Sequence, residues 1–419
     1  MALWIGGNLR FDPPPDGLKT TMETTLKKTI AALACAAATI AAHGQSSLTV
    51  YGSLDLSAGR SETGSGTTLP GGAGTSTAPS QRMYRLDSGA GYGSRLGFRG
   101  LEDLGGGLNA RFVLEMGVAA DTGGLNQGGL AWGRQAYVGV GGNGWTLTMG
   151  RQYSPMNTAI ASSEATGGGY WGSVINQAIG IYESIGSTAG NGSFQTGARI
   201  DNSVLLTANS GPFTGYAMAG AGNENARGTG RFLSLAGTYA DGPLKANLVY
   251  ARMRQNIEQI TATATPEWLS QWSLNGSYNF GPAALYAGYF VFNGPKNRGN
   301  LSAAATPGAA GANARAFSWD KNQIAWVGVK APVGSYNNVL VQVARQTFPY
   351  TGAPDGRATL YAIVGEHLFS KRTLAYVNFG AVTNNDRSNV PLFGGIPQVG
   401  PNGYGADARA VSVGLRHTF

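Results

Sequence analysis

Polar and apolar side chains alternate along most of the chain after residue 46. The alternation is clearest in segments 48–57, 108–116, 272–280 and 411–419. In the second of these, Phe112, Leu114 and Met116 alternate with Arg111 and Glu115. Successive side chains of a β-strand point to opposite faces of the sheet. Each segment therefore predicts a strand with one apolar and one polar face.

Connections of two kinds separate the predicted strands. Seven are short and rich in turn-forming residues, at 102–107, 141–144, 210–212, 241–243, 281–282, 332–336 and 370–372. Eight are longer and rich in Gly, Ser, Ala, Thr and Asn, near 61–83, 120–130, 153–198, 222–229, 255–267, 293–319, 348–357 and 384–407. Fifteen connections predict sixteen antiparallel strands. Short turns at one end and long loops at the other are typical of bacterial outer-membrane barrels.

The alternation alone does not distinguish a soluble β-sandwich from a transmembrane β-barrel, because it does not say which face points outward. After residue 45 no apolar run approaches the roughly 18 residues that a spanning helix needs. A membrane protein without spanning helices must be a closed barrel. Aromatic residues near predicted strand ends favour the barrel, because such residues form girdles at the membrane interface. They are Trp132, Tyr137, Trp145, Trp272, Tyr278, Tyr289 and Trp326.

A leader for export precedes the predicted strands. Lys27 and Lys28 are followed by an apolar stretch over 29–42 and by small residues at Ala42 and Gly44, the pattern of a signal peptide. We expect residues 1–21 to be an extension upstream of the natural start at Met22, and 22–44 to be a cleavable signal peptide. Residues 45–419 then form the barrel domain, in the outer membrane of a Gram-negative cell. The single cysteine, Cys35, would leave with the leader.

Composition and charge narrow the possible partners. Charged residues make up only 12% of the chain, and the net charge is +8, which becomes +7 after residue 44 because residues 1–44 carry four cations and three carboxylates. A basic balance suits nucleic acid, anionic lipid or anionic solutes. No Lys/Arg run is dense enough to predict a nucleic-acid surface. We therefore expect small anionic solutes as partners, together with the surrounding outer-membrane lipid.

Residues for catalysis or metal binding are scarce. Only His367 and His417 remain beyond the leader, and their spacing does not suit a metal site. The chain has no GxSxG motif and no paired-carboxylate motif, so it offers little for nucleophilic catalysis. We expect neither an enzyme nor a cofactor.

Five ordered segments resemble the Gram-negative general diffusion porins, particularly their trimeric, anion-preferring branch. They are SSLTVYGSLDLSAG (46–59), YGSRLGFRGLEDLGGGLNARFVLE (92–115), RQAYVGVGGNGWTLTMGRQYSP (134–155), RIDNSVLLTANSGPFTGYAMAG (199–220) and VGLRHTF (413–419). The resemblance implies an all-β, 16-stranded antiparallel transmembrane barrel that assembles as a homotrimer. It also implies that the third long loop, about 153–198, folds inward and narrows a water-filled pore. Phe419 occupies the place of the aromatic residue that serves as the family's assembly signal.

The same resemblance implies which residues set the selectivity of the pore. Wall arginines match at Arg95, Arg134 and Arg199, and carboxylates of the inward loop match at Glu183 and Glu164. Arginine suits such a wall because it stays charged and is weakly hydrated. Each of these residues could instead be an ordinary solvated side chain. Arg151 shares its predicted face with apolar residues, and we place it outside the pore. Few loop carboxylates beside several arginines predict a preference for anions.

Three other functions compete with a general diffusion porin, and the substrate-specific channel is the main alternative. A substrate-specific channel would line its path with aromatic and basic side chains, and the tyrosines are numerous, although the sequence does not order them along an axis. An outer-membrane enzyme lacks suitable residues. An adhesin would use the barrel only as an anchor, but the loops are too short for a passenger domain.

Overall fold

The computed structural model describes residues 47–68, 70–72, 79–178, 197–222, 230–254, 263, 265–294, 321–350, 353–400 and 402–419. The expected leader and extension, 1–44, therefore lie outside the described residues, as does Glu183. Among the described residues, no helix is both long and apolar enough to cross a bilayer.

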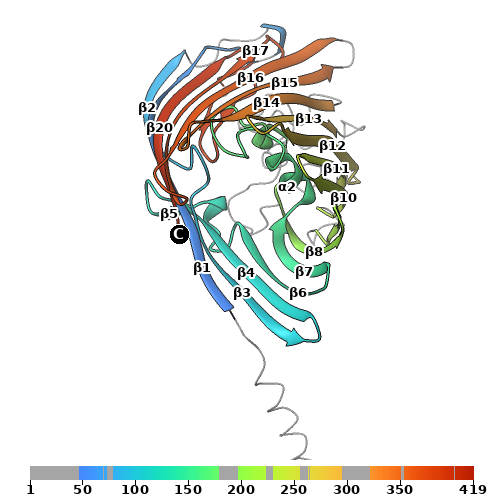
Figure 1. Ribbon diagram of the computed structural model, residues 1–419. Coiled ribbons are helices and arrows are strands. Elements are labelled where there is room, and N and C mark those ends of the chain that lie inside the picture. Colours follow the sequence, from blue (N-terminus) through green and yellow to red (C-terminus); the bar gives the residue numbers. More distant parts are fainter. Residues whose placement is uncertain are drawn as a thin grey trace, which may run out of the picture.

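Sixteen antiparallel strands form a closed ring (Figure 1). They are β1 (Ser47–Thr63), β3 (Arg95–Gly105), β4 (Leu108–Ala119), β6 (Gln135–Gly142), β7 (Trp145–Tyr153), β8 (Arg199–Ser210), β9 (Phe213–Gly220), β10 (Phe232–Asp241), β11 (Leu244–Arg254), β12 (Trp268–Asn279), β13 (Ala284–Asn293), β14 (Lys321–Val333), β15 (Asn337–Tyr350), β16 (Ala353–Leu368), β17 (Thr373–Asn384) and β20 (Ala408–Thr418). The predicted strand number is confirmed. Each strand pairs with its neighbours in this order.

The first and last strands close the ring. Strand β1 pairs with β20 from Ser53 to Thr63, and its other edge pairs first with β3 and then with β2 (Gln81–Ser88). Phe419 exchanges two backbone hydrogen bonds with Gly52, each 3.1 Å long. Closure leaves no open edge within the ring, which is the condition for a sheet that crosses lipid.

The strand faces are inverted relative to a soluble sandwich. On β11 and β12, Leu248 and Leu274 are 59% and 56% exposed, whereas Asn247 and Gln271 are at most 2% exposed. The inward face is therefore polar and the outward face is apolar, as lipid requires. This pattern decides the question that the alternation left open.

The structure corrects expectations about individual segments. The predicted loop at 348–357 is mostly strand, because β15 and β16 continue to a register shift at Phe348 and Tyr350. Pro349 lies at that irregularity, where the missing N–H costs no regular ladder bond. Trp326 does not belong to an outer girdle. It shares the inward face of β14 with buried Asn322 and Ile324, and it is only 5% exposed.

The described part of the third long connection lies inside the ring. It begins with the short helix α2 (Pro155–Ala161), which contacts β10, β11 and β12 (Figure 1). Ser154 caps this helix by accepting a hydrogen bond from the Asn157 N–H. Beyond the helix, Trp326 Nε1 donates to the Ser163 carbonyl and Asn247 Nδ2 donates to Ser163 Oγ.

The same connection continues along the wall toward the last strands. Tyr170 OH donates to Glu366 of β16, and Trp171 Nε1 donates to Ser412 of β20. The segment therefore lies against one side of the lumen, from β10 round to β20. The open space remains beside β1 to β8.

The remaining short elements belong to the other long connections. They are the 3-10 turns η1 (Pro70–Gly72) and η2 (Gln127–Gly129), strand β5 (Gly124–Leu125), and the β18–β19 ribbon (Leu392–Phe393 and Gln398–Val399).

Candidate functional site

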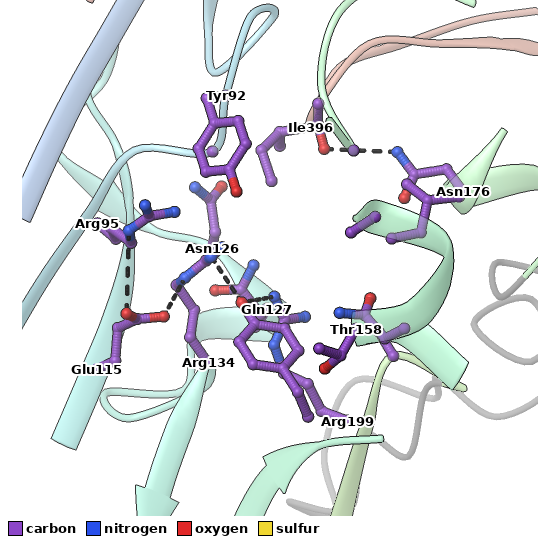
Figure 2. A pocket seen from close by; sticks show the side chains of 18 of the residues that line it. Tyr92, Arg95, Glu115, Asn126, Gln127, Arg134, Thr158, Asn176, Arg199 and Ile396 are labelled. Atoms are coloured by element: carbon purple, nitrogen blue, oxygen red, sulfur yellow. Dashed lines mark hydrogen bonds and ion pairs between the residues drawn. The ribbon is translucent and has the colours of Figure 1, made fainter. Parts of the chain in front are cut away.

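A cavity of about 670 Å³ occupies the open side of the lumen. Wall residues from β1, β3, β4, β7 and β8 line one side of it. Residues 157–176 of the inward connection and residues 393–396 line the other side (Figure 2). The cavity thus lies between the wall and the inward connection.

Three arginines reach this cavity from the wall. Arg95 begins β3, Arg134 immediately precedes β6, and Arg199 begins β8. All three therefore stand at the ends of strands that meet long connections, and they lie at a similar height in the barrel. Arg134 and Arg199 are 6% and 8% exposed, so the surrounding side chains hold them firmly.

Glu115 of β4 lies between two of these arginines. Arg134 Nε donates to Glu115 Oε1 at 2.7 Å, and Arg95 Nε lies 3.9 Å from Glu115 Oε2 (Figure 2). Tyr51 OH also donates to Glu115 Oε2, at 3.0 Å. These contacts hold the Arg134 guanidinium in a charge-assisted bond of fixed geometry.

Tyrosines support the arginines from the other side. Arg134 and Arg199 both donate to the Tyr153 hydroxyl, at 2.7 and 3.0 Å. The Arg199 guanidinium lies 4.7 Å from the centre of the Tyr153 ring, and that of Arg95 lies 4.8 Å from the Tyr92 ring. A cation over an aromatic face is attracted by the ring quadrupole, so these rings position the charges without neutralising them.

The charge of the cavity follows from this arrangement. Among the described residues that line it, the ionised groups are three arginines and Glu115. One carboxylate and three guanidiniums give this described lining a formal excess of two positive charges.

Glu164 lies in the inward connection but away from the cavity. It is 1% exposed, and it accepts hydrogen bonds from Ser173 Oγ, the Val174 N–H and Gln342 Nε2. Burial raises the pKa of this carboxyl, and the three donors partly offset that effect. Its place favours an anchoring role over a role facing solutes.

The bulge at the start of β8 separates two residues that simple alternation places on one face. The register shifts between Gly150 and Gln152, and Asn202 adopts a left-handed φ of 49°. Arg199 consequently faces the cavity, whereas Asp201 pairs with Arg151 outside it. Strict alternation, which would place residues 199 and 201 on one face, therefore fails across this bulge.

Phe419 ends the chain on the outward side, 44% exposed. A Cβ atom placed on Gly52 would collide with the Phe419 ring, so the glycine makes room for that ring.

Sequence reasoning missed Glu115 and Tyr153 as cavity residues. The alternation of β4 carried a signal for Glu115, which shares the polar face of that strand with Arg111. Tyr153 carried none, because it lies at the boundary between β7 and the inward connection.

The comparison with family models decides the identity of the fold. The model of the Gram-negative porin matches residues 30–387. The chain belongs to the Gram-negative porin family. It is therefore an outer-membrane porin, a non-enzymatic channel for passive diffusion of small hydrophilic solutes.

Individual relatives agree with this assignment. Outer membrane porin protein 32 of Delftia acidovorans is 30% identical over 94% of this chain and 100% of its own length. An outer membrane porin protein of Bordetella pertussis is 28% identical over the same shares.

Solved structures agree as well. An anion-selective porin from Comamonas acidovorans superposes with a TM-score of 0.67 at 25% identity, covering 90% of this chain and 100% of that one. A trimer form of OmpT from Vibrio cholerae has a TM-score of 0.57 at 14% identity, covering 89% of this chain and 99% of that one.

Proposed function

We propose that this porin prefers small anions, and that Arg95, Arg134 and Arg199 form the wall of its constriction. The observation that carries the proposal is the excess of two positive charges on the lining, counted over the described residues. A pore whose wall has an excess of one sign concentrates ions of the opposite sign. The anion-selective porin from Comamonas acidovorans, at 25% identity, supports the same preference.

The inward connection supplies the opposing side of the proposed constriction. Its described carboxylate, Glu164, is buried and bound by three donors, so it does not oppose the arginines across the cavity. We assign it the task of fixing the connection to the wall through Gln342 of β15. Glu183 remains a candidate for an acidic residue facing the pore.

Assembly as a homotrimer is part of the proposal. It is supported by the family and by the trimer form among the matching folds. Phe419, on the outward side at the closure of the ring, is proposed as the assembly signal, and residues 22–44 as the signal peptide.

Planar-bilayer recording of the purified protein tests the ion preference and the trimer. Current steps in groups of three indicate a trimer of pores, and the reversal potential under a KCl gradient gives the ion preference. We expect the potential to report Cl⁻ as the more permeant ion. Clear cation preference would overturn the proposal, and saturable block by one solute class would indicate a substrate-specific channel instead.

A further inference from the structure

A second concave surface lies on the outside of the barrel, on β8 to β11. It is a groove of about 490 Å³ with Leu206, Leu235, Leu248 and Tyr250 on its sides and Gly215 and Gly237 on its floor. Val249, between Leu248 and Tyr250, is buried on the lumen side. The groove therefore faces lipid, behind the wall that α2 contacts from within.

The pairing register shows why a groove forms here. Gly215 pairs with Gly237, and Ala217 pairs with Leu235, so β9 contributes only small side chains between the larger ones of β8 and β10. Toward the short turns the groove is closed by Phe213 and Tyr239, whose ring centroids are 5.1 Å apart. The other end of the groove lies toward the long connections.

Arginines stand at that other end, on the same outward face. Arg252 and Arg254 follow Leu248 and Tyr250 at two-residue steps along β11, so Arg252 lies roughly 13 Å beyond Leu248. The Arg254 N–H donates to the Arg231 carbonyl at 2.8 Å, so Arg231 lies beside Arg254. None of the ion pairs among the described residues includes these three arginines.

Trp268 places the arginines at the depth of the membrane interface. The Arg252 and Arg254 guanidiniums lie 5.0 and 6.0 Å from its ring centre. Tryptophan on a membrane protein is enriched at the level of the lipid headgroups. Long connections of such barrels face the cell exterior, so this interface belongs to the outer leaflet.

We propose that this surface binds a phosphorylated lipid of the outer leaflet. One acyl chain lies in the groove between Leu206 and Leu235, and a phosphate contacts Arg252 and Arg254. An isolated arginine cluster on the lipid side is unfavourable through mutual repulsion of like charges, and an anionic phosphate removes that repulsion. The charge and the apolar volume thus match two parts of one molecule.

The test uses the purified oligomer in detergent with lipid A bearing its phosphates, and with the same lipid after dephosphorylation. Native mass spectrometry measures the amount bound to each. We expect Arg252→Gln with Arg254→Gln to lower binding of the phosphorylated lipid roughly 25-fold, about fivefold for each arginine. Binding of the dephosphorylated lipid should stay unchanged. Arg357→Gln is the matched control, because Arg357 is exposed near a long-connection end and pairs with Asp355.

A second variant tests the groove itself. A Cβ on Gly237 would meet nothing within 4 Å, so Gly237→Leu fills the groove without displacing the backbone. We expect it to weaken both lipids. Gly365→Leu is the control, since Gly365 is equally open and exposed on β16. Equal binding of the two lipids, or equal behaviour of the two leucine variants, overturns the proposal. A changed oligomer mass in Gly237→Leu would also overturn it, by showing that another subunit occupies the groove.

Discussion

Replacing Arg199 should change the ion selectivity, because its charge faces the cavity while its backbone lies in the rigid wall. Arg199→Gln lowers the excess charge of the described lining from two to one, and Arg199→Glu lowers it to zero. For an ion about 7 Å away in water, each unit charge contributes roughly 0.6 kcal/mol, and 0.1 M salt about halves this. The effect has opposite signs for Cl⁻ and K⁺, so the two contributions add in the permeability ratio.

The arithmetic gives a decrease of about threefold in the Cl⁻/K⁺ permeability ratio for Arg199→Gln and about sevenfold for Arg199→Glu. Reversal potentials in a KCl gradient measure it, and the difference should shrink at high salt. Arg151→Gln is the matched control, because Arg151 lies on the neighbouring strand but pairs with Asp201 outside the cavity. If both glutamine variants shift the potential equally, the charge of the cavity lining does not set selectivity and the reasoning fails.

Three further predictions concern the inward connection and the closure of the ring. Trp326→Phe removes the 2.8 Å hydrogen bond to the Ser163 carbonyl, which should weaken the attachment of the inward connection to the wall by about 1 kcal/mol. Single-channel current noise should therefore increase, and unchanged noise would show that other contacts hold the connection in place. Burial raises the pKa of Glu164, so the folded protein holds this proton more tightly than the unfolded chain, and the contribution of Glu164 to stability is lost as pH rises through that pKa. Glu164→Gln should therefore flatten the pH dependence of thermal denaturation, and an unaltered profile would contradict the raised pKa. Phe419→Ala should lower the amount of heat-stable oligomer in outer membranes without changing the conductance of the channels that assemble, whereas normal yields would remove Phe419 from assembly.

The barrel could be predicted from the sequence because the two features that determine it, alternation and turn residues, are local. Alternation gives each strand its two faces, and turn residues such as those at 281–282 separate the strands. Trp326 shows the limit of reading residue type alone, because a large aromatic side chain near a strand end favoured an outer girdle. The structure instead uses it inside, where Gly288 leaves space for the ring.

The site could be predicted only in part, because its geometry depends on contacts between residues that are distant in the sequence. Arg95 and Arg134 could be placed from motifs, yet the carboxylate that lies between them comes from β4. One of the three donors to Glu164 is Gln342, which lies 178 residues further along the chain. The register shift at the start of β8 depends on the left-handed backbone of Asn202. A glycine would have signalled such a conformation in the sequence, but an asparagine does so only weakly. Alternation does not encode any of these contacts.

Closure of the ring between β1 and β20 has a consequence for biogenesis. The strand that is exported first can complete its hydrogen bonding only after the strand that is exported last. Until then, the edges of β1 and β20 both carry unpaired amides and carbonyls, which are energetically unfavourable in the hydrocarbon core of the bilayer. The chain must therefore wait outside the bilayer in a sheltered state, and removal of its final residues would stall the earliest strand together with the latest.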